Sequence, residues 1–312
     1  MPDFETLSKT LEVATEIATA AVADLLPLAA DFEAAVKGKI ADLPDGGVMN
    51  AHGRKAWDMA QYDFLENECP PTINPSLWRM ARLNTIGGLF EVKPDVWQAR
   101  GFDYANMTII CGQTGWILID PLMTAETSAS ALEVVKETLE KRPVSAVILT
   151  HTHPDHFGGL RGVVNVHAPP PIYAPEGFLD FAASEGILGG DHTSRRAIYQ
   201  FGLTLDAGAQ GAVDGGIGKT VGKGNRTFVP PSEFIGETGA KRVIDGVRFV
   251  FAMACGTEAP AEFTFLLPEH GVLCMAEVCT ETQHNILTPR GAQVRDALLW
   301  ARCIDERRHI VC

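Results

Sequence analysis

The sequence predicts an α/β layered domain, and three observations in its middle third support this fold class. Residues 107–111 and 116–120 are two β-type runs separated by a Gly-rich turn at 112–115, which is typical of a hairpin. Residues 124–139 have helical periodicity, and residues 143–149 form a short apolar, β-branched run that suits a strand buried on both faces. Strand, hairpin, helix and strand in this order indicate helices layered on a sheet.

The N-terminal segment predicts a helix that ends at Pro27. We expect its apolar face to dock on the chain's own domain, and a contact with a partner helix is the alternative. Residues 40–85 are rich in Pro, Gly, Asn and aromatics without a clear period, so we expect an irregular wrap there. The expected division is therefore helix and wrap over 1–85 and a main domain over 86–312. The apolar face consists of Phe4, Leu7, Leu11, Ala14, Ala18, Ala21 and Leu25, at alternating spacings of three and four.

Thr124 is expected to cap the central helix, because a threonine side chain can accept from the free N–H groups of the first turn. Within that helix Leu132, Val135 and Leu139 share one face. The strand over 143–149 follows and leads directly into the most specific pattern of the chain.

That pattern is an HxHxDH run, formed by His151, His153, Asp155 and His156 and followed by paired glycines. Imidazole nitrogens and carboxylate oxygens are the ligands that zinc and similar divalent ions take in proteins. If the glycines let the chain turn tightly into the next helix, His151 and His153 can point to one metal while Asp155 and His156 serve a second. The run therefore predicts a two-metal site, and a solvated His-rich turn is the alternative.

A polar, Gly-rich stretch at 207–224 predicts a surface loop near the site entrance. It lacks the GxxxxGK[ST] spacing of a phosphate-binding loop, which argues against a nucleotide site. Strands are expected again at 242–254, 262–267 and 272–276, the last two joined by a turn at 268–271.

A pair of zinc ions needs more negative charge than Asp155 provides, so we expect further carboxylate ligands. Glu258 follows one predicted strand and Glu277 ends another. Together the three carboxylates would leave one positive charge, which a bound hydroxide would neutralise. For each glutamate alone, a solvated loop position is an equal alternative.

An anion site is expected further along the chain. Thr288 and Pro289 are typical of a helix cap and first helical position, which would place Arg290 at a positively polarised helix end. Arg290 forked on a sulfate or phosphate, with Asn285 donating beside it, would bind an oxyanion. The alternative is an arginine paired with a carboxylate to fix the helix.

Composition narrows the partners and the compartment. At 312 residues and 46% hydrophobic content the chain can bury one large core, with or without an appendage. A net charge of −13 and the lack of clustered Lys and Arg oppose nucleic acid or an anionic membrane as partner. The first 36 residues hold one lysine against seven carboxylates, so neither a signal peptide nor a membrane span is expected, and we predict a cytoplasmic protein. Seven cysteines without a CxxC pair predict reduced thiols.

Taken together, these residues resemble the alkyl sulfatases of the metallo-β-lactamase fold. The resemblance covers about residues 40 to 302, and its strings are more specific than the HxHxDH run alone. Besides that run they are Asn74–Arg79, Gly88–Val92, Arg100–Asp103, Asn106–Thr108, Thr114–Trp116, Ile119–Leu122, Gly256–Glu262, Met275–Glu277, His284–Asn285 and Arg290–Asp296.

The resemblance implies a metallo-β-lactamase-like αββα sandwich with an N-terminal helical extension and two zinc ions per chain. It implies that Asn285 and Arg290 hold the sulfate group of the substrate. The residues expected to act in catalysis are Asp155, Glu277 and Arg290. The implied ligands are His151, His153 and Glu258 for one metal, Asp155 and His156 for the other, and Glu277 as the bridge between them.

Members of this family are much longer than this chain. Beyond this region they carry another histidine ligand for the second metal, a helical dimerisation region and a small lipid-carrier-like domain. This chain stops at Cys312, and His309 lies too early to be that ligand. We therefore expect a sandwich that is incomplete at its C-terminus and a weakened second metal site, and a homo-oligomer stays open.

The expected reaction is zinc-dependent hydrolysis of an alkyl sulfate ester, such as dodecyl sulfate, to an alcohol and inorganic sulfate. The zinc pair would lower the pKa of a bound water, while Arg290, Asn285 and the metal charge stabilise the sulfate oxygens. One alternative is a truncated, catalytically silent metal-binding remnant or gene fragment. Another is a hydrolase of the same fold acting on lactones or thioesters. Alkyl chain preference, stereochemistry and C–O versus S–O cleavage stay open.

Overall fold

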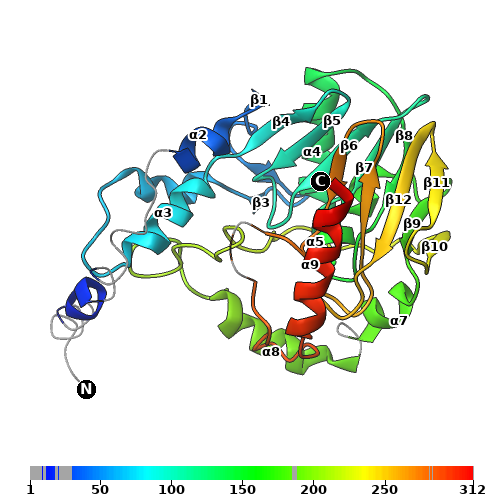
Figure 1. The fold of residues 1–312 in the computed structure, drawn as a ribbon. Helices are drawn as coiled ribbons and strands as arrows, with labels where there is room; N and C mark the ends of the chain where they lie inside the picture. The colour runs from blue at the N-terminus through cyan, green and yellow to red at the C-terminus, as the bar shows by residue number, and fades with distance from the viewer. Residues whose placement is uncertain are drawn as a thin grey trace.

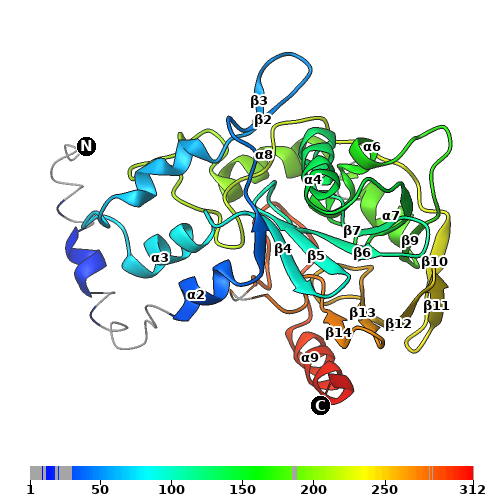
Figure 2. The ribbon, with the colours of Figure 1, turned by 90° about the horizontal axis from the view of Figure 1, so that it is seen from above.

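The computed structural model describes residues 9, 12–17, 20, 30–184, 188–280, 282 and 284–311. Two β-sheets pack face to face in the middle of the molecule, and helices cover their outer faces (Figure 1). Figure 2 shows the order of the layers: α4 and α6, the larger sheet, the smaller sheet, and α9. The predicted αββα sandwich is confirmed.

The larger sheet has the strand order β1-β4-β5-β6-β7-β8-β9-β10. Its first half is antiparallel, and β7, β8, β9 and β10 run parallel to one another. The strands are β1 (Lys39–Ala41), β4 (Gly88–Lys93), β5 (Val96–Arg100), β6 (Met107–Cys111), β7 (Trp116–Ile119), β8 (Val144–Ile148), β9 (Ile172–Pro175) and β10 (Glu233–Ile235).

The smaller sheet is an antiparallel meander of β11 (Lys241–Ile244), β12 (Val247–Met253), β13 (Phe263–Leu267) and β14 (Val272–Cys274). A separate hairpin pairs β2 (Val48–Met49) with β3 (Lys55–Trp57). Between the two sheets lies an apolar core in which Ile117 and Ile148 of the larger sheet meet Phe251 of the smaller one. This core fixes the relative position of the loops that leave β8, β12 and β14.

The helices are α2 (Ala30–Val36), η2 (Ala60–Glu66, a 3-10 helix), α3 (Pro75–Leu83), α4 (Ala125–Thr138), α5 (Pro154–Phe157), α6 (Leu160–Val163), α7 (Phe178–Ala183), α8 (Gly190–Phe201) and α9 (Ala297–Val311). None of the helices among the described residues has the length and apolar character needed to cross a membrane. The cysteines in the same ranges are free thiols, as expected.

Several local predictions are confirmed. Residues 107–111 and 116–119 are paired as the expected hairpin. The side chain of Thr124 accepts a hydrogen bond from the backbone N of Thr127 at 3.3 Å, so this residue caps α4. Leu132 and Val135 are buried against the larger sheet.

The prediction of one strand over 242–254 is wrong, because the run is split into β11 and β12. Asp245 and Gly246 both have positive φ, at 44° and 83°, and they form the tight turn between the two strands. An Asp-Gly pair between apolar runs is a signal for such a turn.

The prediction of a helix that begins at Pro289 is also wrong. Residues 289–290 form a turn, in which the backbone N of Gly291 donates to the carbonyl oxygen of Thr288 at 3.0 Å. Gly291 has a φ of 103°, which a helix does not allow. The helix begins later, at Ala297, where the Asp296 side chain accepts from the backbone N of Leu298 and of Leu299.

Gly158 and Gly159 serve a different purpose from the predicted tight turn. Their φ angles, −62° and −86°, are open to any residue. A Cβ on Gly158 would lie 2.2 Å from the carbonyl oxygen of Met123, and one on Gly159 would lie 2.1 Å from that of Pro121. The glycines are therefore required for close packing of the loop that carries the HxHxDH run against residues 121–123, before α4.

The N-terminal segment is more regular than predicted. Residues 40–85 contain η2 and α3, and the strand β1 at their start pairs with β4 in the larger sheet. Asn74 caps α3 by accepting from the backbone N of Ser76 at 2.9 Å. Residues 12–17 are helical, whereas most of the predicted apolar stripe, including Leu7 and Leu25, lies outside the described residues. The division at residue 85 stays a prediction.

The Gly-rich loop at 207–224 lines a cavity near the predicted metal site, but it is not simply a surface loop. Lys219 is buried and forms an ion pair with buried Asp214 at 3.0 Å. Its Nζ also donates to the carbonyl oxygen of Ala81 in α3 and lies 4.9 Å from the ring centre of Tyr62. This lysine therefore fastens the N-terminal wrap to the main domain.

We predict that Lys219→Met lowers the free energy of unfolding by about 3–5 kcal/mol, because it leaves the Asp214 carboxylate buried without its cation. Urea unfolding of the whole chain measures the change. The double variant Lys219→Met with Asp214→Leu is the control and should regain most of the loss, because an apolar pair can replace a buried ion pair. A single variant as stable as the parent would contradict the prediction.

Candidate metal centre and anion site

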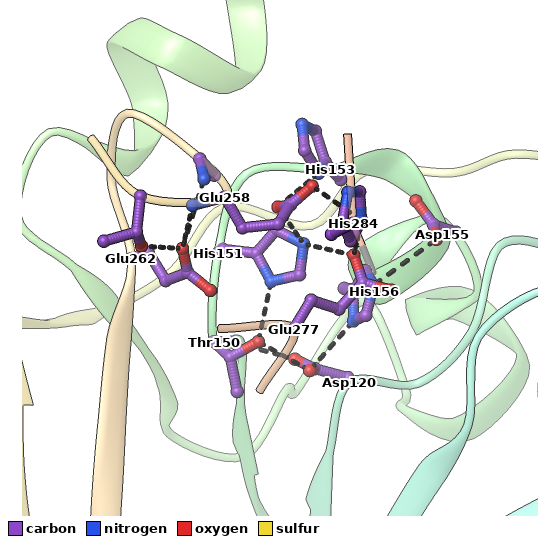
Figure 3. A network of polar contacts seen from close by, with 12 residues as sticks. Asp120, Thr150, His151, His153, Asp155, His156, Glu258, Glu262, Glu277 and His284 are labelled. Atoms are coloured by element: carbon purple, nitrogen blue, oxygen red, sulfur yellow. Dashed lines mark hydrogen bonds and ion pairs between the residues drawn. The ribbon is translucent and has the colours of Figure 1, made fainter. Parts of the chain in front are cut away.

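The HxHxDH run follows the carboxyl end of β8, which is an interior strand of the larger sheet. His153 takes an extended conformation just before α5, and Pro154 occupies the first position of that short helix. This arrangement turns the chain between the histidines, so that His151, His153 and His156 are all buried and face one another (Figure 3). The ring centres of His151 and His156 are 4.0 Å apart.

The structure brings both predicted glutamates to these histidines, from loops of the smaller sheet. Glu258 lies in the loop between β12 and β13, with its Oε2 2.8 Å from His153 Nδ1 and 3.3 Å from His151 Nε2. Glu277 follows β14. Its Oε2 lies 3.6 Å from His151 Nε2 and its Oε1 lies 3.5 Å from His156 Nε2, so its two oxygens face different histidines.

Asp155 completes the arrangement, with its Oδ2 3.3 Å from His156 Nε2. Three overlapping groups result, in each of which the ligand-type atoms lie within 4.8 Å of one another. They are His151, His153, Glu258 and Glu277; Asp120, His151 and His156; and Asp155, His156 and Glu277.

The polar atoms of this cluster fit divalent metal ions. Within the described residues, His151 Nε2, His156 Nε2, His284 Nε2 and Glu258 Oε2 are buried and make no hydrogen bond of good geometry, although Glu258 Oε2 lies 2.8 Å from His153 Nδ1. Buried polar atoms normally have partners, since leaving one unsatisfied costs about 1–3 kcal/mol. Imidazole nitrogens and carboxylate oxygens that converge at these distances form a donor set for divalent metal ions such as zinc.

Asp120 is a site residue that the sequence reasoning missed. Its Oδ2 lies 2.9 Å from His156 Nδ1, and its two oxygens accept from the backbone N and the hydroxyl of Thr150 at 2.8 and 2.6 Å. A carboxylate on Nδ1 holds that proton and presents Nε2 as the ligand atom. The signal was its position directly after the buried strand β7, and its φ of 53° shows that the chain bends sharply there.

His284 and Arg295 were also missed as site residues. His284 Nε2 lies 3.5 Å from Glu258 Oε1 and 3.8 Å from Glu277 Oε2. Arg295 is buried and pairs with Glu258 Oε1. No spacing in the sequence connects these residues, because only packing of the segment before α9 brings them to the cluster.

Both predicted anion-binding residues lie close to the cluster, Arg290 at His153 and Asn285 at Arg295. Arg290 Nη2 is 3.1 Å from His153 Nε2, and the backbone N of Arg290 donates to Gln200 of α8 at 2.9 Å. Asn285 is exposed, and its Oδ1 accepts from Arg295 at 3.2 Å. Arg290 lies in a turn instead of at a helix end, so its own guanidinium would supply the positive charge.

The cluster perturbs the acidity of its members. Burial, with the nearby His156, holds the pKa of His151 well below its usual range. Burial alone would also lower the pKa of His156, but the carboxylates of Asp155, Glu277 and Asp120 outweigh it and raise this pKa well above the usual value. Burial would raise the pKa of Glu277, and His156 outweighs it, so that pKa lies well below its usual range. Without a metal, Glu277 is therefore held in its ionised form by His156.

Glu262 shapes the loop that carries Glu258. Its Oε2 accepts from the Thr257 hydroxyl at 2.9 Å and from the backbone N of Glu258 and Ala259 at 3.2 and 3.1 Å. Burial, followed by the charge of Glu258, raises the pKa of Glu262 well above its ordinary value. At pH values between the ordinary glutamate pKa of 4.5 and this raised pKa, the folded protein therefore holds a proton on Glu262 that the unfolded chain releases.

We predict that the metal-free protein loses stability as pH rises above the ordinary glutamate pKa of 4.5, and that Glu262→Gln removes this part of the loss. A group whose pKa is raised by folding contributes stability at low pH, which disappears as pH passes its folded pKa. Urea unfolding at several pH values, with a chelator present, compares the two proteins. Parallel curves would contradict the prediction, and Glu262→Ala should be less stable at every pH.

A cavity of about 480 Å³ borders one side of the cluster. Its lining includes His156, Glu277 and Asp120 of the cluster, together with Tyr104 and Lys219. The cavity is mixed in polarity and reaches from the metal loop toward the N-terminal wrap.

Comparison with known proteins agrees with this geometry. The sequence profile of the Metallo-beta-lactamase superfamily matches residues 100–311. An (R)-specific secondary-alkylsulfatase from Pseudomonas sp is 44% identical over 306 residues, which are 96% of this chain and 46% of that protein. The alkyl/aryl-sulfatase BDS1 of Saccharomyces cerevisiae is 43% identical over 97% of this chain and 47% of its own length.

A solved structure, that of the stereoselective inverting sec-alkylsulfatase Pisa1 from Pseudomonas sp., superposes with a TM-score of 0.90. It is 42% identical, and the match covers 96% of this chain and 48% of that one. The chain thus spans about half the length of the curated relatives it matches. It belongs to the metallo-β-lactamase superfamily, and within it is similar in sequence and fold to alkyl sulfatases.

Proposed function

We propose that this protein hydrolyses alkyl sulfate esters to an alcohol and inorganic sulfate, with two zinc ions per chain. The observation that carries the proposal is the convergence of the buried ligand-type atoms of His151, His153, His156, Glu258 and Glu277, with the guanidinium of Arg290 against His153. A cationic centre next to an arginine suits an anionic substrate. The relatives named as alkylsulfatases support the choice of substrate class.

The residues divide into two zinc sites. His151, His153 and Glu258 would hold one ion, Asp155 and His156 the other, and Glu277 would contact both through its separate oxygens. Bound zinc would lower the pKa of a water molecule and polarise the sulfate group. Because the second ion has fewer ligands among the described residues, it should bind more weakly.

His153 connects the metal site to the anion site. Its Nδ1 faces Glu258 Oε2 and is the atom placed to bind metal, while its Nε2 faces Arg290. A neutral imidazole that binds metal through Nδ1 carries its proton on Nε2. That nitrogen can no longer accept from Arg290, so Arg290 is expected to donate to a sulfate oxygen instead, with Asn285 Nδ2 as a second donor.

The leaving group decides how much acid catalysis the reaction needs. Sulfate is weakly basic, so attack at carbon requires little protonation, whereas attack at sulfur expels an alkoxide that must take up a proton. We propose attack at carbon. Hydrolysis in ¹⁸O-labelled water tests this, because label found only in the sulfate would exclude it.

The test of the proposed function is sulfate release from dodecyl sulfate by the 312-residue chain with added zinc. His153→Ala is the inactive control, since it removes both a proposed zinc ligand and the ring that Arg290 contacts. A lactone and a thioester are assayed in parallel. Release no faster than with His153→Ala would contradict the proposal, and turnover of the lactone or thioester alone would indicate a different hydrolase.

A further inference from the structure

Arg295 is buried beside the proposed metal site and contacts Glu258, a proposed zinc ligand, through the oxygen that faces away from His151 and His153. Its side chain is 4% exposed, and its backbone N donates to the carbonyl oxygen of Ile286 at 3.0 Å. The next residue, Asp296, donates to the carbonyl oxygen of Gly256 and caps α9. The guanidinium carbon lies 5.7 Å from the ring centre of Trp300.

The guanidinium contacts three side chains of the site at once. Nη2 donates to Glu258 Oε1. Nη1 donates to the carbonyl oxygen of Asn285 at 2.8 Å and to its Oδ1 at 3.2 Å, and it lies 2.7 Å from His284 Nδ1. A planar fork with several fixed donors can orient several acceptors together, which a lysine cannot do.

Each contact has a consequence for the partner. With Oε1 of Glu258 engaged by Arg295, Oε2 is the oxygen that faces His151 and His153. With Oδ1 of Asn285 engaged, the Nδ2 group is the part of that amide available to donate to an anion.

The contact with His284 selects its tautomer. Arginine has no acceptor, so Nδ1 of His284 must accept from it, and the neutral ring then carries its proton on Nε2. That nitrogen lies 3.5 Å from Glu258 Oε1 and 3.8 Å from Glu277 Oε2 and forms no hydrogen bond among the described residues. His284 therefore presents a proton to the carboxylates and not a lone pair to a metal.

We propose that Arg295 is a positioning residue that sets the ligand oxygen of Glu258, the amide orientation of Asn285 and the tautomer of His284. The inference rests on the metal site of the proposed function, but it does not depend on which ester is hydrolysed. It can therefore be tested by metal binding as well as by turnover.

The experiment measures zinc affinity, by competition with a chromophoric chelator, for the parent, Arg295→Met and Arg295→Lys. Removing a nearby positive charge should by itself strengthen zinc binding. Loss of a positioning contact should instead weaken it, by about 10–100-fold. We expect Arg295→Met to bind zinc more weakly than the parent, and Arg295→Lys, which keeps the charge but not the fork, to lie between them.

Arg307→Met is the matched control. Arg307 is also a buried arginine, and it lies in α9. It donates to the Thr264 hydroxyl at 3.2 Å and to the carbonyl oxygen of Met253 at 2.6 Å, and neither residue belongs to the metal cluster. Its loss should lower the melting temperature without changing zinc affinity. If Arg295→Met does not fold, the zinc affinity of Arg295→Lys is compared with that of Arg307→Met, and the proposal requires weaker binding by Arg295→Lys.

Zinc affinity at or above the parent's in the Arg295 variants would overturn the proposal, whatever their melting temperatures. If the Arg295 variants bind zinc more weakly but the parent releases no sulfate, the proposed function is contradicted. The positioning role of Arg295 is then still supported. A parent chain that binds no zinc would overturn both.

Discussion

Glu277→Ala should lower sulfate release by more than about a thousandfold, or about 4 kcal/mol in the activation free energy, because activation of water depends on the metal pair. Glu277 is the side chain whose two oxygens face both histidine groups, at 3.6 Å from His151 and 3.5 Å from His156. Its removal affects both proposed zinc sites. Initial rates with dodecyl sulfate and zinc content per chain, measured on the same preparations, check the result.

The control for this variant is Glu269→Ala. Glu269 lies in the turn between β13 and β14, is 46% exposed and pairs with Arg248 on the surface. It is a glutamate of the same small sheet without a contact to the metal cluster, so rate and zinc content should both stay at parent values. A Glu277→Ala protein that retains two zinc ions and a tenth or more of the parent rate would contradict a bridging role.

The second large effect is expected at Arg290. Arg290→Ala should lower kcat/KM for dodecyl sulfate by about 10²–10³-fold, the usual loss when a donor to the developing negative charge is removed. Zinc content should not change, because Arg290 contacts His153 through Nε2, the nitrogen opposite the one that faces Glu258. Steady-state kinetics together with zinc analysis separate the two effects.

Two further variants sharpen this test. Arg290→Lys should recover part of the loss, because it restores the charge without the two-pronged geometry. Arg161→Ala, at an exposed arginine on α6, should behave as the parent. If Arg290→Ala loses zinc in proportion to its rate, Arg290 acts by supporting His153 and the sulfate-binding role is wrong.

Much of the fold was predictable because its signals are local. The hairpin of β6 and β7, the cap at Thr124 and the buried strand β8 each depend on residues close together in the chain, and all three are confirmed. The errors have local causes as well. The turn at Asp245 and Gly246 was overlooked inside an apolar run, and the Pro289 signal was overridden by Gly291, whose φ of 103° ends any helix there.

The candidate site divides in the same way. The HxHxDH run can be recognised from the sequence, because its four ligand-type side chains lie within six residues. The need for carboxylates to balance the charge of two zinc ions then pointed to Glu258 and Glu277. Asp120, His284 and Arg295 carry no such pattern. Arg295 is 37 residues from Glu258 along the chain, and Asp120 is 36 residues from His156, yet both pairs are in contact.

By itself, then, the sequence determined the donor chemistry of this protein and its α/β layered class, since both follow from residue type and short-range periodicity, while the αββα sandwich was implied by the resemblance to alkyl sulfatases. The tertiary structure alone decided which oxygen of each carboxylate faces the histidines. It also decided that Arg290 approaches His153 from a turn, and that Arg295 connects Glu258 and His284 to Asn285. These arrangements arise where two sheets pack through a shared apolar core, which brings together loops from β8, β12 and β14 that no local pattern connects.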